Sequence, residues 1–120
     1  MVLNMGTEDS GPNWVNNVRD APIIADIEEH QYYRQPHFYA MAHFSKFLAP
    51  GSRRIDSEVI SQNNSKAIVA AFRTAQNEST VVIVVNNDET TVRLTLDDRK
   101  VGRLVATVEP KSIQTYVYYD

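Results

Sequence analysis

Three histidines, His30, His37 and His43, are the first side chains to weigh for chemistry, because neutral imidazole can bind a metal or act as a general base. His37 and His43 lie six positions apart, whereas a helical zinc motif places two ligands four apart on one face. This spacing predicts structural or solvent-facing histidines and no metal site. The four glycines are isolated and form no phosphate-binding loop, so no nucleotide or other cofactor is predicted.

Six carboxylates lie within the first 29 residues, and paired carboxylates about 5 Å apart are what a retaining glycosidase uses as acid/base and nucleophile. The surrounding stretch is polar, so a solvated surface explains these charges without catalysis. We therefore predict no catalytic pair among Glu8, Asp9, Asp20, Asp26, Glu28 and Glu29.

Aromatic side chains gather in three places, and such groups can stack on sugar rings or cover an apolar core. Packing in a core or interface is the favoured interpretation. The side chains of the C-terminal tail alternate as those of an edge strand do, and packing is enough to explain its tyrosines. The aromatic residues concerned are Tyr32, Tyr33, Phe38, Tyr39, Tyr116, Tyr118 and Tyr119.

One helix is predicted over Pro36–Leu48. Pro36 suits a first helical turn, and Pro50-Gly51 supplies a residue that cannot continue the helix followed by a permissive one. Its apolar stripe finds no obvious cover elsewhere in the chain, which suggests that something upstream is missing. The stripe consists of Phe38, Met41, Ala42, Ser45 and Leu48, widened by Phe44 and Phe47.

Residues 1–27 read as loop, with turn chemistry at Gly11-Pro12-Asn13 and a short extended piece at Pro22–Ala25. From Ser52 onward, short β-branched runs separated by polar turns predict an antiparallel β-sandwich. Val81–Val85 is apolar throughout and should be central, and Asn86–Asp88 is interpreted as a hairpin turn. The expected strands are Ile55–Ser61, Lys66–Arg73, Thr80–Asn86, Thr91–Leu96, Gly102–Val108 and Ser112–Tyr118.

Composition excludes several classes of function. A formal charge of −3 from dispersed side chains, with no polybasic stretch, argues against a nucleic-acid partner. The longest apolar run is far shorter than the roughly 20 residues of a membrane-spanning helix, so no transmembrane segment is expected. Met1–Ser10 does not resemble a signal peptide, and the absence of cysteine excludes disulfides without fixing a compartment.

Two sequons make Asn63 and Asn77 weak candidates for glycosylation.

Two ordered blocks carry a family resemblance. Gly11–Asn17 (GPNWVNN), followed by Asp20–Ile24 (DAPII), resembles the segment after the last barrel strand in glucosylceramidases of glycoside hydrolase family 30. Tyr33–Phe47, which contains YRQPHFY and HFSKF, is similar to the final barrel helix of that family. The later strands, ending in Ile113–Tyr116, resemble the C-terminal sandwich of the family in pattern more than in identity.

The resemblance implies a mostly β chain. Residues 1–51 would be the end of a catalytic (β/α)8 TIM barrel, with the last strand end, loop and final helix, and residues 52–120 a C-terminal antiparallel β-sandwich domain. The catalytic glutamates of the family lie at the fourth and seventh barrel strands, whereas this sequence resembles the family from the eighth onward. Whether the chain itself is an enzyme is therefore left uncertain, and the isolated chain is expected to be inactive. Full-length members cleave glucosylceramide to glucose and ceramide in sphingolipid metabolism.

One pocket residue carries over by resemblance. Asn17 matches the asparagine at the rim of the glucose pocket, whereas Val18 stands where the family usually has an aromatic residue and Arg19 where it has an apolar one. The competing interpretation is that Asn17 only satisfies loop backbone. The family further implies a lysosomal or secretory location, an upstream barrel segment, and help from a lipid-binding activator protein.

Two alternatives stay open at this level. The sandwich could work alone as a carbohydrate- or protein-binding module, which exposed aromatics on one sheet face would favour. The chain could also be a structural remnant without activity.

Overall fold

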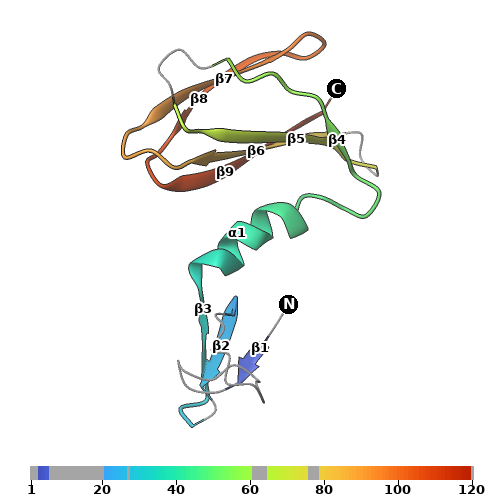
Figure 1. The fold of residues 1–120 in the computed structure, drawn as a ribbon. Coiled ribbons are helices and arrows are strands. Elements are labelled where there is room, and N and C mark those ends of the chain that lie inside the picture. The colour runs from blue at the N-terminus through green and yellow to red at the C-terminus, as the bar shows by residue number, and fades with distance from the viewer. Residues whose placement is uncertain (1–2, 6–20, 27, 61–64, 76–78, 120) are drawn as a thin grey trace. The chain divides into compact units, whose positions relative to one another are not determined.

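The computed structural model describes residues 3–5, 21–26, 28–60, 65–75 and 79–119. By its internal contacts the chain divides into two compact units, residues 1–42 and residues 43–120 (Figure 1). Strands dominate the described residues, and among these residues one helix precedes the larger set of strands.

The first unit contains a three-stranded sheet in the order β1-β2-β3. β1 (Leu3–Met5) pairs in parallel with β2 (Ile23–Asp26), which pairs antiparallel with β3 (Gln31–Arg34). The predicted extended piece at Pro22–Ala25 is confirmed by β2. The loop prediction for residues 1–27 is wrong at β1, and no sequence pattern predicts β3. A strand of three or four residues is too short to show a period, and β1 owes its pairing to a partner twenty positions away.

Helix α1 spans Pro36–Ser45 and begins at the predicted proline. The predicted end at Leu48 is wrong by three residues, although the Leu48 N–H still donates to the Phe44 carbonyl at 2.9 Å. None of the helix residues is fully buried, but the expectation that nothing in the chain covers the apolar stripe holds only in part, because Phe44 contacts Phe72 edge-to-face. Beyond the helix, Gly51 adopts φ +89° in a turn that the Ser52 N–H closes by donating to the Ala49 carbonyl. A side chain would be strained there, which explains the glycine.

The second unit is a sandwich of two antiparallel sheets (Figure 1). The larger sheet has the order β4-β5-β6-β9, and the smaller pairs β7 with β8. Their bounds are β4 Arg53–Ile55, β5 Ile68–Arg73, β6 Ser79–Asn86, β7 Val92–Asp98, β8 Gly102–Val108 and β9 Ser112–Tyr119.

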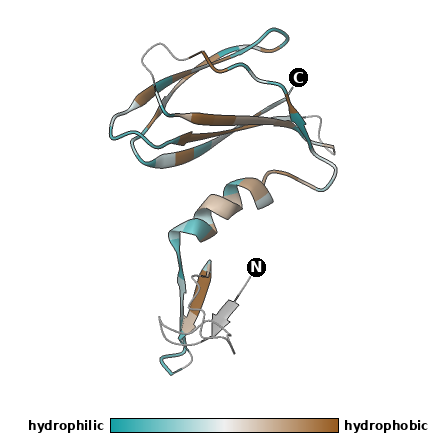
Figure 2. Ribbon diagram, in the orientation of Figure 1, coloured by the Kyte–Doolittle hydropathy of each residue, from teal (hydrophilic) through white to brown (hydrophobic). Residues whose placement is uncertain are grey.

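The core lies between the two sheets, and Figure 2 shows the apolar colouring of β5 and β6 that contributes to it. Ala71, Val82, Val84 and Val108 form its fully buried part. The central position predicted for the Val81–Val85 run is confirmed, because β6 lies between β5 and β9 and is buried on both faces. The alternation predicted for β7 and the edge position of β9 are also confirmed. Partly buried side chains that complete the core are Val69, Val92, Leu94, Leu96, Tyr116 and Tyr118.

Two sandwich predictions fail. The strand predicted at Ile55–Ser61 is wrong, because β4 ends at Ile55 and residues 56–60 form no ladder. Their β-branched side chains suit a strand, but propensity alone forms none without a partner to bond. Val59 and Ile60 are accordingly exposed.

The hairpin predicted at Asn86–Asp88 is the second failure. β6 pairs with β5 and β9, whereas β7 pairs with β8, so the chain crosses here from one sheet to the other. The Asn86 side chain explains the asparagine: its amide nitrogen donates to the carbonyls of Thr90, Val108 and Glu109 at 2.9–3.1 Å. Its Oδ1 accepts from the Asp88 N–H at 3.0 Å. Local turn chemistry cannot distinguish a hairpin from a crossing, because both reverse the chain.

Candidate functional site

Several residues singled out from the sequence fall outside the described part of the chain. These residues are Asn17 with its neighbours Val18 and Arg19, the sequon asparagines Asn63 and Asn77, and the carboxylates Glu8, Asp9 and Asp20. Asn17 as a pocket residue, and the two asparagines as glycosylation sites, therefore stay predictions.

The described carboxylates Asp26, Glu28 and Glu29 belong to the turn between β2 and β3. The Asp26 Oδ1 accepts from the Glu29 N–H at 3.1 Å, which stabilises the turn. Glu28 and Glu29 are exposed. This is the environment of solvated surface charges.

The three histidines lie in unrelated places. His30 holds φ +54° in the β2–β3 turn, and His37 is half-buried in α1. His43 Nδ1 lies 2.8 Å from the Thr115 hydroxyl oxygen of β9, so the last turn of α1 is bonded to the outer face of the larger sheet. Within the described ranges, no three His, Cys, Asp or Glu side chains gather as they would around a metal ion. Nor is any helix there long and apolar enough to cross a membrane.

The aromatic residues divide between core and surface. Tyr116 and Tyr118 pack against the sandwich core, as predicted, and burial raises the pKa of Tyr116. The Tyr118 hydroxyl donates to Asp98 Oδ2 at 3.0 Å and so links the two sheets. The tyrosines of the first unit are exposed, as is Tyr119 of β9 at 66%, so these four are not core residues, and their packing at an interface stays a prediction. The exposed fractions are 61% for Tyr32, 50% for Tyr33 and 53% for Tyr39.

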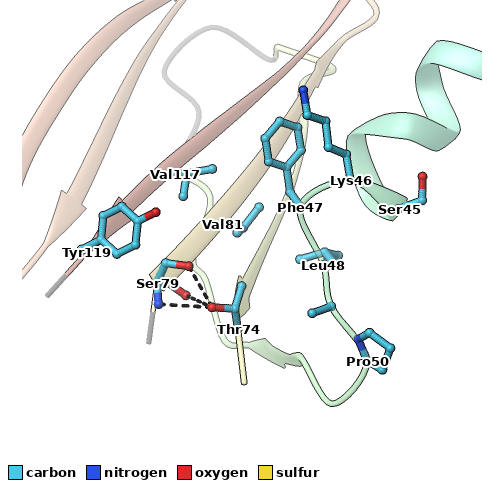
Figure 3. A pocket seen from close by; sticks show the side chains of 11 residues that line it. Ser45, Lys46, Phe47, Leu48, Pro50, Thr74, Ser79, Val81, Val117 and Tyr119 are labelled. Atoms are coloured by element: carbon cyan, nitrogen blue, oxygen red, sulfur yellow. Dashed lines mark hydrogen bonds between the residues drawn. The ribbon is translucent and has the colours of Figure 1, made fainter. Parts of the chain in front are cut away.

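A hollow of about 380 Å³ opens on the outer face of the larger sheet, wholly within the second unit (Figure 3). Residues 45–50 form one side, and the sheet contributes Thr74, Ser79, Val81, Val117 and Tyr119. The register places Ser79 opposite Tyr119 and Val81 opposite Val117, so these four side chains lie on one patch of β6 and β9. No local sequence pattern signals this hollow, because its walls come from four separate segments.

The polar end of the hollow is a compact network of hydroxyl and backbone groups. Thr74 Oγ1 lies 2.8 Å from Ser79 Oγ, accepts from the Ser79 N–H at 3.2 Å and lies 3.3 Å from the Ser79 carbonyl oxygen. The Thr74 N–H also donates to that carbonyl at 3.0 Å. Both residues are buried, at 9% and 3% exposure. The network closes the β5–β6 connection and fixes where the two hydroxyls lie.

Two family models match adjacent parts of the chain. The model of the glycosyl hydrolase family 30 TIM-barrel domain matches residues 2–48, and that of the family 30 β-sandwich domain matches residues 51–116.

Among curated proteins, the mouse lysosomal acid glucosylceramidase is 41% identical over 110 residues, which cover 92% of this chain and 21% of the mouse protein. Putative glucosylceramidase 3 of Caenorhabditis elegans is 31% identical over 112 residues, which cover 92% of this chain and 21% of that protein. The chain thus spans about a fifth of the length of these relatives, in their C-terminal part. Among solved structures, SrfJ from Salmonella typhimurium superposes with a TM-score of 0.86 at 25% identity, covering 98% of this chain and 25% of that one.

Proposed function

We propose, since the chain belongs to glycosyl hydrolase family 30, that it forms the C-terminal part of a glucosylceramidase. The longer protein would be a retaining glycoside hydrolase that cleaves glucosylceramide to glucose and ceramide in sphingolipid metabolism. One observation carries the proposal. The barrel model and the sandwich model of the family match adjacent segments of the chain, and the curated relatives that match it are glucosylceramidases.

In this proposal the chain supplies scaffold and pocket rim, and the acid/base and nucleophile come from the preceding barrel. A retaining mechanism needs two carboxylates about 5 Å apart. The described carboxylates of the first unit stabilise a turn or face solvent, which supports a source elsewhere. Asn17 is the residue that we propose for contact with the glucosyl ring. We place the boundary between the barrel end and the sandwich after Gly51, where a turn ends the segment that follows α1.

The proposed location is the lysosome or the secretory pathway, with a lipid-binding activator protein as a partner. The name of the mouse relative, a lysosomal enzyme, supports the location. The exposed tyrosines of the first unit, and Met41 of the α1 stripe at 51% exposure, support the upstream barrel segment as the partner of this part of the chain.

Hydrolysis of a fluorogenic β-glucoside at acidic pH tests the proposal, with the purified chain and a longer product of the same gene assayed side by side. We expect turnover by the longer product and none by the 120-residue chain. Turnover by the short chain would refute the scaffold role and return attention to the carboxylates of residues 8–29. A longer product that folds but cleaves neither the fluorogenic substrate nor glucosylceramide would refute the proposed activity.

A further inference from the structure

We propose that the hollow on the outer face of the larger sheet is a non-catalytic binding site for one neutral pyranose ring. The inference goes beyond the proposed function, which places the glucosyl pocket in the barrel. It depends only on the second unit, residues 43–120, which contains all the described residues that line the hollow.

The size and aromatic walls of the hollow favour a ring-shaped ligand. About 380 Å³ lies within the usual range of small-molecule sites, roughly 300–1,000 Å³. Tyr119 and Phe47 both line it, and in Figure 3 Val81 and Val117 lie between their two rings. Tyr119 is 66% exposed although it belongs to β9, so its ring is available to a ligand. An amphipathic ring such as tyrosine can cover the C–H face of a sugar while its hydroxyl stays in water.

The polar end of the hollow suits sugar hydroxyls. A side-chain hydroxyl offers one hydrogen and two lone pairs. Among the described residues, the partner of Ser79 Oγ is Thr74 Oγ1, and that bond uses one of the three positions. The other two hydrogen-bonding positions belong to Ser79 Oγ. This oxygen has a fixed position, because its partner Thr74 is itself held by the Ser79 backbone. A pyranose hydroxyl can donate there without any new ordering of the protein.

The described lining of the hollow offers few charged groups that could bind an ionic ligand. Lys46 is the only charged residue among the described ones that line it. Its ammonium lies 5.5 Å from the centre of the Phe47 ring, so it already has a cation–π partner. Among the described lining residues, no guanidinium is present to grip a carboxylate or phosphate by two bonds. An acyl chain would fit Leu48, Val81 and Val117, but it would offer no partner to the hydroxyl positions of Thr74 and Ser79 that their mutual bond leaves free, at a cost in free energy.

The test is an NMR titration of the whole 120-residue chain with methyl β-D-glucopyranoside, followed through the backbone amides. Sodium decanoate is the probe for the competing acyl ligand. We expect saturable glucoside shifts centred on Phe47, Thr74, Ser79 and Tyr119. Tyr119→Ala should weaken the affinity by about fivefold, as the loss of one aromatic contact predicts, and Tyr119→Phe should largely restore it.

Tyr33→Ala is the matched control, because Tyr33 is also an exposed tyrosine of an edge strand and lies outside the hollow. It should leave the affinity unchanged. Equal losses in the two alanine variants, glucoside shifts confined to other residues, or shifts with decanoate alone would each overturn the proposal. So would the absence of saturable shifts with either probe. The titration measures binding and not hydrolysis. A negative titration therefore does not contradict the proposed function, and a negative hydrolysis assay does not contradict this binding site.

Discussion

The side-chain amide of Asn86, at the end of β6, donates to the carbonyl of Val108, at the end of β8, across 3.1 Å. Both residues are 0% exposed, and the two strands belong to different sheets. One buried amide thus links the two layers of the sandwich at the point where the chain crosses between them. The same nitrogen also lies within hydrogen-bond distance of the Thr90 and Glu109 carbonyls, so its two N–H groups are shared among three backbone carbonyls.

Asn86→Ala should therefore destabilise the sandwich by about 3 kcal/mol, because it leaves buried carbonyls without donors. Urea unfolding followed by circular dichroism measures the change. Asn87→Ala is the matched control, since Asn87 is the exposed next residue and its side chain is not part of this network. A loss below about 0.5 kcal/mol for Asn86→Ala would show that water replaces the amide and that the link is unimportant.

The bond between His43 and Thr115 should couple α1 to the sheet. The His43 Nδ1 and Thr115 Oγ1 atoms lie 2.8 Å apart and are partly buried. A double-mutant cycle of His43→Ala and Thr115→Val should give a coupling of about 1 kcal/mol in the free energy of unfolding. The same cycle with His37→Ala in place of His43→Ala should give no coupling, and equal couplings in the two cycles would contradict a specific bond.

Tyr116 should make the sandwich less stable at alkaline pH. Burial raises its folded-state pKa above the ordinary value of 10.0, because the neutral phenol is easier to bury than the phenolate. The stabilisation from the protonated form is complete below the unfolded-state pKa and is lost as the pH rises through the folded-state pKa.

Unfolding by urea at about pH 9 and about pH 11 tests this dependence. Tyr116→Phe, which cannot ionise, should lose less stability between the two values than the parent chain does. Tyr119→Phe, at an exposed tyrosine of the same strand, should behave like the parent. If Tyr116→Phe lost as much stability between the two pH values as the parent chain, ionisable groups other than Tyr116 would be the cause of the pH dependence.

Asn17 should matter only for substrate binding. In the longer gene product, Asn17→Ala should raise KM for a β-glucoside by about fivefold, which corresponds to the loss of one hydrogen bond. Asn16→Ala is the control for a general disturbance of the loop. Unchanged KM in Asn17→Ala, together with a lowered melting temperature, would favour the competing interpretation in which Asn17 satisfies loop backbone.

Much of the fold follows from local patterns. Pro36 marks the start of α1, and the alternation of Val92, Leu94 and Leu96 marks β7, because cap chemistry and side-chain period act within a few residues. The strand predicted at Gly102–Val108 has the same bounds as β8. The GPNWVNN and YRQPHFY blocks, in that order along the chain, are sufficient to indicate the family.

Only tertiary structure decided how those elements meet. β1 exists because Leu3 pairs with Ile23, and the chain crosses between sheets at Asn86 because β7 pairs with β8 and not with β6, so each depends on a partner elsewhere in the chain. The hollow likewise joins residues 45–50 to the ends of β5, β6 and β9. The sequence by itself determined where most strands and the helix form, because propensity and period are local. The choice of sheet, crossing and cavity belongs to the tertiary structure, because it depends on pairing and burial between residues that the sequence keeps apart.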